Sequence, residues 1–148
     1  MDIHLFGRRM IELLPQMIRG FAQRESNYLS RGRITLPQLW VLEFLSRNDL
    51  CPMNELARFL RISRPGATGL VDRLIAQNLV HRVSDSRDRR LVRVGLTAKG
   101  RRVLGNIWDQ KRRMLVEVFG QIPAGDRAQY LRTLERVVGI LSQNRRKR

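Results

Sequence analysis

Arginines crowd a short stretch between two β-type runs of the sequence. Residues 81–97 read HRVSDSRDRRLVRVGLT, and the tip of this stretch, SDSRDRR, is almost entirely charged. A planar guanidinium group offers five N–H donors and pairs in bidentate fashion with phosphate or carboxylate oxygens. Because like charges repel, the tip gains no obvious stability from its arginines. The pattern therefore indicates an anionic partner outside the chain.

Other residues that could carry chemistry are few. Cys51 is the single cysteine, so a disulfide within the chain is impossible. His4 and His81 have no neighbouring Cys, His or carboxylate at metal-ligand spacing, and we expect no metal site and no cofactor. No nucleophile–base pair, phosphate-binding loop or pair of carboxylates stands out, so we expect no enzymatic activity.

The whole chain shares the basic character of this tip. Its 148 residues include 29 Lys and Arg but only 13 Asp and Glu, which gives a net charge of +16. The strong preference for Arg over Lys can reflect a GC-rich genome, but such a genome does not explain the excess of positive charge. A surface of this kind favours a polyanion, and nucleic acid is the default candidate.

A membrane partner is the alternative, and the sequence disfavours it. There is no long apolar run and no lipidation motif. The first residues, MDIHLFGRRMIELLPQ, carry charges inside the apolar stretch and show no small-residue cleavage site, so no signal peptide is expected. Together with the single cysteine, these features predict a cytoplasmic protein.

The elements that must position the basic groups are mostly helices. Apolar residues at helical spacing predict a helix over residues 3–30, in which Pro15 either begins the helix proper or kinks it. Thr35 is a good N-cap for a second helix, and Pro37 falls in its first turn. The residues of this second helix expected to face a core are Leu39, Trp40, Leu42, Phe44 and Leu45.

Residues 51–82 have the layout of a helix-turn-helix. MNELARFL (53–60) predicts a short helix, and RIS predicts a tight break. Ser63 can cap a second helix, which ends near Asn78 as a left-handed terminator. The start of that helix is small and polar, as suits a face that approaches DNA closely. The residues expected to contact DNA from this recognition helix are Ser63, Arg64, Pro65, Ala67, Thr68 and Arg73.

A helix-turn-helix followed at once by a charged β-hairpin is a winged helix. The helix would read the major groove, and the wing would place Arg87, Arg89 and Arg90 in the adjacent minor groove. A narrow minor groove concentrates negative potential and attracts arginine. Asp85 and Asp88 could orient the guanidinium groups through bidentate pairs.

The order of these pieces resembles the MarR (multiple antibiotic resistance regulator) family of winged-helix transcription factors. ITLPQLWVLEFL, ELARFLRISRPGATGLVDRLIAQNLVHR, DSRDRR and VGLTAKGRRVL carry the resemblance, which covers about residues 34–104. The tip resembles the family's D-x-R-D-x-R pattern, with Asp85, Arg87, Asp88 and Arg90 on the matching positions. The resemblance implies an obligate homodimer that binds pseudo-palindromic operators in double-stranded DNA and usually represses. It also implies release by small phenolic or lipophilic ligands, or by cysteine oxidation.

Two amphipathic segments after the hairpin, 98–122 and 124–148, are predicted to form helices. A three-helix reader of this size does not need them to fold, so we expect them to pair with the same helices of a second subunit. The predicted fold is mainly α, a winged helix-turn-helix whose N- and C-terminal helices form a dimerisation region. The predicted domains are an N-terminal dimerisation helix at 1–33, a DNA-binding domain at 34–97, and C-terminal dimerisation helices at 98–148.

An effector site is harder to place. The resemblance implies that effectors lodge between the dimer helices and the DNA-reading lobe. The apolar residues that could line such a crevice are Met17, Phe21, Leu36, Trp40 and Trp108, although helical apolar stripes are usually just core. Arg24 and Arg31 could pair with a carboxylate or phenolate. Peroxide-sensing relatives carry their reactive cysteine in the first helix, where this chain has none, so we expect no redox role for Cys51.

The sequence thus predicts a dimeric, sequence-specific DNA-binding transcriptional regulator, a repressor released by a small lipophilic or phenolic ligand. A first alternative is a non-specific nucleic-acid-binding architectural protein, which the net charge would serve. A second is a ligand-binding dimer that has lost operator specificity. A regulator requires a steep ratio between its affinities for operator and random DNA, whereas an architectural protein shows almost none.

Overall fold

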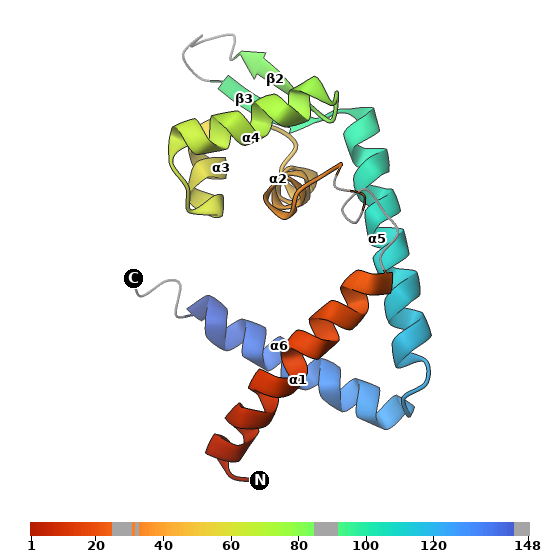
Figure 1. Ribbon diagram of the computed structural model, residues 1–148. Helices are drawn as coiled ribbons and strands as arrows, with labels where there is room; N and C mark the ends of the chain where they lie inside the picture. Colours follow the sequence, from red (N-terminus) through yellow and green to blue (C-terminus); the bar gives the residue numbers. More distant parts are fainter. Residues whose placement is uncertain (25–30, 32, 85–91, 144–148) are drawn as a thin grey trace. The chain divides into compact units, whose positions relative to one another are not determined.

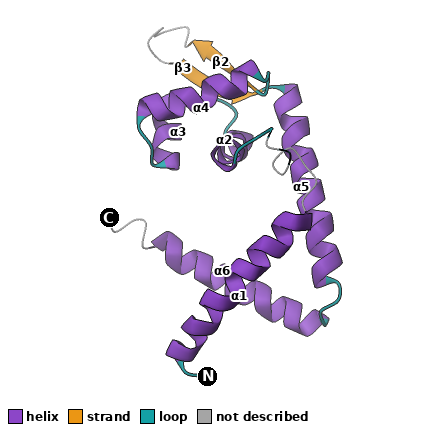
Figure 2. Cartoon of the chain, in the orientation of Figure 1, coloured by secondary structure: helices purple, strands orange, loops and turns teal. Residues whose placement is uncertain are grey.

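The computed structural model describes residues 1–24, 31, 33–84 and 92–143. These residues form two compact units, 1–111 and 112–148, each described here by itself. The described elements, in chain order, are α1 (Ile3–Arg24), α2 (Leu36–Arg47), β1 (Cys51–Pro52), α3 (Met53–Leu60), α4 (Arg64–Ala76), β2 (Val80–Ser84), β3 (Val92–Leu96), α5 (Ala98–Phe119) and α6 (Ala124–Gln143) (Figures 1 and 2). None of these helices is long and apolar enough to cross a membrane.

A small antiparallel sheet lies beside the helix-turn-helix (Figure 2). The predicted hairpin is β2 and β3, with Val80 opposite Leu96 and Ser84 opposite Val92. The third strand, β1, pairs with the other edge of β3, so the strand order is β1-β3-β2. The sequence predicts a loop at Cys51, before the helix-turn-helix, and this is wrong because Cys51 begins the two-residue strand β1.

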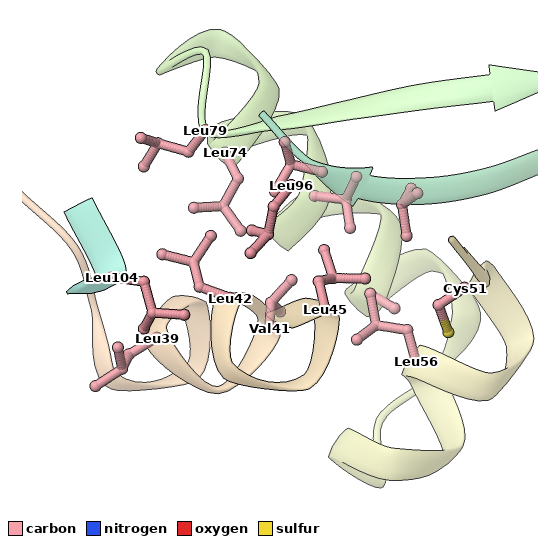
Figure 3. Close-up of a cluster of buried hydrophobic side chains, with 14 of the residues drawn as sticks. Leu39, Val41, Leu42, Leu45, Cys51, Leu56, Leu74, Leu79, Leu96 and Leu104 are labelled. Carbon is pink, nitrogen blue, oxygen red and sulfur yellow. The ribbon is translucent and has the colours of Figure 1, made fainter. Parts of the chain in front are cut away.

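One apolar core joins the helix-turn-helix to the sheet and to the start of α5. In Figure 3 the side chains of α2, including Val41, Leu42 and Leu45, point toward Leu74 of α4 and Leu96 of β3. All of the fully buried apolar residues described lie between Ile34 and Ile107, whereas α1 and α6 contain no buried residue. Burial of apolar surface stabilises folding by roughly 25 cal/mol for each Å². The segment from Ile34 to Ile107, called the reader below, therefore has an apolar core of its own.

The start of α2 follows the local rule predicted for it. The backbone N–H of Thr35 donates to Gln38 Oε1 at 2.8 Å, and Thr35 Oγ1 accepts from the backbone N–H of Gln38 at 3.5 Å, which makes a capping box. Pro37 lies in the first turn, as expected. Of the predicted core face, Leu39, Leu42 and Leu45 are buried. Trp40 is 44% exposed, so its assignment to the core was wrong, and Phe44 is only partly buried.

The helix-turn-helix is confirmed residue by residue. The backbone turns at Arg61, which has φ 55, directly after α3 ends. Ser63 Oγ then accepts a hydrogen bond from the backbone N–H of Gly66 at 3.2 Å and caps α4, with Pro65 in the first turn. Asn78 has φ 59 and terminates the helix in the left-handed conformation expected of it.

The remaining helices also follow the sequence pattern, with two differences. Pro15 lies inside α1, which runs unbroken through it; residues 25–30 of the predicted helix lie outside the described part. The predicted segments 98–122 and 124–148 contain α5 and α6, which end at Phe119 and Gln143; residues 144–148 lie outside the described part. The sequence predicts a break at Pro123, Gly125 and Asp126, but Gly125 and Asp126 lie in the first turn of α6.

Candidate nucleic-acid interface

The recognition helix α4 has one face in the core and one face outside it (Figure 1). Ala67, Val71 and Leu74 are fully buried against the rest of the reader. The exposed positions of its N-terminal half are Ser63, Arg64, Pro65, Gly66 and Gly69, and Arg73 follows on the next turns. A Cβ built on Gly69 meets no atom within 4 Å, so open space adjoins this face.

The predicted recognition residues divide into three groups. Arg64, Pro65 and Arg73 are exposed, and Ser63 is exposed while its oxygen serves as the N-cap. Thr68 is half-buried, and its hydroxyl donates to the carbonyl of Arg64 at 3.0 Å. Ala67 is 0% exposed and belongs to the apolar core, in which α4 packs on α2 and α3. Naming Ala67 as a direct DNA contact was therefore wrong.

An ion pair ties the hairpin to the recognition helix. The Arg82 guanidinium of β2 lies 2.7 Å from the Asp72 carboxylate of α4. Both side chains are partly exposed, so the pair adds at most about 1 kcal/mol to stability. The pair links β2 to α4 directly. The predicted wing contacts Arg87, Arg89 and Arg90 lie outside the described residues.

Hydrogen bonds that the sequence did not predict fix the C-terminal end of α4 to the start of α5. Thr97 donates through its hydroxyl to the carbonyl of Asn78 at 2.7 Å and through its N–H to the carbonyl of Leu79 at 3.1 Å. Lys99 Nζ donates to the carbonyl of Gln77 at 2.9 Å. Thr97 Oγ1 also accepts from the N–H of Gly100 at 2.9 Å and so caps α5. In the sequence these residues are the run Thr-Ala-Lys-Gly (97–100), which is part of the resemblance to the MarR family. The run alone does not predict these hydrogen bonds.

Positive charge concentrates around the turn that leads into α4. Arg58, Arg61 and Arg64 are all exposed there. The free N–H groups at the start of a helix add partial positive charge to the same region. A face with small side chains and flanking arginines can approach a polyanion without steric obstruction. This arrangement can bind an anion.

Cys51 is buried and chemically quiet. Its side chain is 1% exposed, and Figure 3 shows it beside Leu56. Burial raises the pKa of the Cys51 thiol to about 11, and the negative charge of Glu55, whose Oε2 lies 3.8 Å from Sγ, adds to the shift. The thiolate is the reactive form of cysteine, so the thiol is unreactive at neutral pH.

We therefore expect Cys51→Ser to leave DNA binding and its response to mild peroxide unchanged. At pH 7 a thiol with a pKa of about 11 is deprotonated in roughly one molecule in 10⁴. Gel shift of wild type and variant, with and without peroxide, measures the response. Release of wild type but not of Cys51→Ser by peroxide would show that this cysteine is a redox switch.

The predicted effector residues are only partly brought together. Trp108 of α5 donates through Nε1 to Glu43 Oε1 of α2 at 3.4 Å. Glu43 lies three residues after Trp40 in the same helix. The two indoles are 42% and 44% exposed. Met17 of α1 is 38% exposed, and Phe21 of the same helix is half-buried. Among the described residues, no three His, Cys, Asp or Glu side chains are placed to hold a metal ion.

Comparison with known proteins gives matches over the reader and beyond it. The MarR family model matches residues 34–91. YsmB, an uncharacterised HTH-type transcriptional regulator of Bacillus subtilis, is 30% identical over 97 residues, 66% of this chain and 66% of its own. BadR, a transcriptional activatory protein of Rhodopseudomonas palustris, is 34% identical over 117 residues, 76% of this chain and 65% of its own. The matches thus span just under two thirds of these relatives.

The fold extends the likeness to the whole chain. The crystal structure of a MarR-like transcriptional regulator from Thermotoga maritima has a TM-score of 0.75 and 26% identity, with 96% of this chain and 98% of that one covered. The matched relatives are transcriptional regulators and not enzymes, which confirms that no catalytic activity is expected of this chain. From the helix-turn-helix geometry, the hairpin register and these matches, the chain belongs to the MarR family of winged-helix transcriptional regulators.

Proposed function

We propose that this chain is a dimeric, sequence-specific DNA-binding regulator that acts in the cytoplasm as a repressor. The observation that carries the proposal is the exposed, small-residue face of α4, flanked by Arg64 and Arg73 and coupled to the hairpin by the Asp72–Arg82 pair. That face suits the major groove, where base edges present a distinct pattern for every base pair. In this proposal residues 34–97 read DNA, and residues 1–33 and 98–148 form the dimer.

A homodimer is supported by the apolar surface of the helices outside the reader. Within α6 every residue is exposed, and Leu131, Leu134, Val138 and Leu141 recur at helical spacing along one side. α1 likewise exposes Leu14 and Ile18 and has no buried residue. An exposed apolar face of this length marks a protein interface. A two-fold axis would then set two recognition helices about 34–36 Å apart, one turn of DNA.

The dimer predicts a specific response to charge on α6. In solution wild type should have about twice the 17.3 kDa mass of one chain, measured by light scattering. Leu134→Lys places a charge on the apolar side and should give a monomer with weakened operator binding. Gln129→Lys adds the same charge on the opposite side of the helix and should remain dimeric. A monomeric wild type, or a dimeric Leu134→Lys, would contradict the proposed interface.

Repression and release by a ligand are the finer parts of the proposal. A dimer seated on a promoter can block transcription by occupancy alone, whereas activation needs a further contact with polymerase. BadR is named as an activatory protein, so repression has to be tested for this chain. Expression of a reporter gene behind the operator shows whether this chain represses or activates transcription. The exposed Trp40 and Trp108 are the groups that would bind a lipophilic or phenolic effector, with Met17 and Phe21 as further candidates. Quenching of indole fluorescence by such compounds tests this assignment.

The roles of helix and wing can be separated by two substitutions. Arg64→Ala removes a base-reading group, so it should cost about 1–3 kcal/mol on the operator and less on random DNA. Arg90→Ala should weaken both duplexes more evenly, because the minor groove carries a degenerate base code. Both variants are measured against the operator and a scrambled duplex at one salt concentration, after melting curves and mass confirm a folded dimer.

The opposite pattern would reverse these roles. If Arg90→Ala destroys the choice between the two duplexes and Arg64→Ala lowers overall affinity only, the wing reads sequence and the helix positions the protein. A second candidate function, non-specific packaging of nucleic acid, is favoured by the net charge of +16. That function predicts equal losses on both duplexes for both substitutions.

A further inference from the structure

The turn between α3 and α4 holds an arginine in a backbone conformation that arginine rarely adopts. Arg61 has φ 55 and ψ 42, in the left-handed region. Among the described residues the only other non-glycine with positive φ is Asn78. Asparagine tolerates this region far better than arginine, and glycine adopts it without steric cost. The turn therefore keeps a strained residue type at a position where glycine would fit better.

The hydrogen bonds of the turn use only the backbone of Arg61. Its N–H donates to the carbonyl of Arg58 at 3.2 Å, and the N–H of Ile62 donates to the carbonyl of Ala57 at 3.2 Å. These bonds close the last turn of α3 and require the left-handed conformation. The side chain is exposed, and in the part of the chain that the structure describes it takes part in no ion pair or hydrogen bond. The guanidinium thus adds nothing to the fold that glycine would lack.

The position of this guanidinium suggests what it contacts. Arg61 lies two residues before Ser63, the cap of the recognition helix, and exposed Arg58 and Arg64 lie on either side of it in the sequence. No carboxylate lies between Glu55 at the start of α3 and Asp72, and Asp72 is paired with Arg82. The charged residues nearest to it in the sequence are therefore basic. An exposed guanidinium in such surroundings has unused donors for a phosphate.

We propose that Arg61 binds a DNA backbone phosphate beside the bases read by α4. This inference rests on DNA binding by the helix-turn-helix, and it adds a contact outside the recognition helix and the wing. Phosphate contacts fix the register of a protein on the duplex without reading its sequence. The strain at Arg61 is then retained because the turn places a charged group against the DNA that glycine could not supply.

Arg61→Gly should change stability and binding in opposite directions. Relief of the left-handed strain outweighs the extra freedom of the unfolded chain, so Tm should rise by roughly 1–4 °C. Removal of a phosphate-binding group should lower affinity on the order of tenfold for each phosphate at about 0.1 M salt. The slope of log affinity against log salt should become shallower by about 0.9 for each phosphate that the protein no longer neutralises. A residue with only a structural role would leave that slope unchanged.

Three matched variants complete the test, on random duplex as well as on operator. Arg61→Lys keeps the charge and should keep most of the salt slope. Arg61→Asn tolerates the turn but lacks the charge, so its slope should fall as much as that of Arg61→Gly. Asn78→Gly places glycine at the other positive-φ position and should leave the slope at its wild-type value.

Two results would overturn the proposal: an unchanged salt slope in Arg61→Gly, or a lower Tm in that variant. An equal fall of the slope in Arg61→Lys would also overturn it, because the interaction would then not depend on charge. The random duplex keeps this test separate from the proposed function. A wild-type protein without operator preference would contradict sequence-specific regulation, yet its salt slope on random DNA would still respond to Arg61 as stated.

Discussion

Raising the salt concentration from about 50 to about 200 mM is expected to lower the affinity for DNA by roughly 10³–10⁵. Each phosphate neutralised by the protein releases condensed counterions, and added salt opposes that release. Arg73 on α4 and Arg87 and Arg90 on the wing, with the basic groups around them, are expected to supply on the order of 6–10 phosphate contacts in a dimer. Equilibrium binding measured by fluorescence anisotropy over this range gives the slope directly.

The slope also shows where the net charge of +16 acts. Much of the basic excess lies outside the reader, for example at Arg112 and Arg113 of α5 and at Arg132 and Arg136 of α6. A steep slope means that many of the basic groups lie on the DNA. A shallow slope would mean that most of the charge is away from the interface, and that composition was a misleading guide to the partner.

Gly100→Ala is expected to lower the stability of the fold more than a substitution at an exposed position would. A Cβ built at Gly100 would lie 2.1 Å from the carbonyl oxygen of Leu79 and 3.0 Å from its carbon, both of them backbone atoms. That carbonyl is held in place by the N–H of Thr97 at 3.1 Å, so it cannot retreat without disrupting the junction between α4 and α5. Overpacking against backbone should cost about 3 kcal/mol or more, a fall in Tm of roughly 6–12 °C.

Gly105→Ala is the matched control on the same helix. A Cβ built there meets nothing within 4 Å, so the methyl group should add helix propensity and raise stability by about 0.5–1 kcal/mol. Thermal melting followed by circular dichroism measures both variants. If Gly100→Ala melts within a degree or two of wild type, the close approach of α5 to Leu79 is absent in solution.

Features set by local chemistry could be predicted from the sequence. Thr35 and Ser63 are N-cap residue types, and each is followed by a proline in the first turn of a helix, where proline is tolerated. Asparagine enters the left-handed region more readily than most residues, so Asn78 can end α4. Each of these helix ends therefore has a local cause. The helix-turn-helix and the hairpin that follows it could also be predicted, because they are consecutive in the sequence. These agreements reflect interactions between residues at most a few positions apart.

Features set by tertiary packing could not be predicted in the same way. β1 is two residues long, too short for any alternating pattern, and it exists only because β3 offers an edge. Trp40 follows the apolar period of α2 yet lies outside the core, because period alone does not say which apolar face is covered. The small size of Ala67 suggests a DNA-facing position. That same size allows α4 to pack closely on α2 and α3, and the packing decides its place.

The junction at the end of α4 shows the same limit. The bonds from Thr97 to Asn78 and from Lys99 to Gln77 join residues 19 and 22 positions apart. A single sequence does not show which residues form such pairs, although the pairs connect the end of the recognition helix to α5. The arginine at position 61 is the reverse case. Its left-handed backbone is visible only in the structure, while its charge was already visible in the sequence.

The central claim is that the exposed face of α4 reads a particular DNA sequence. Its most direct test is a competition experiment with labelled DNA from upstream of the chain's own gene and unlabelled random duplex of equal length, at one stated salt concentration. We expect the upstream DNA to be bound roughly 10³–10⁷ times more tightly than the random duplex. Equal competition by the two duplexes would contradict the claim and would show a protein that binds nucleic acid through charge alone.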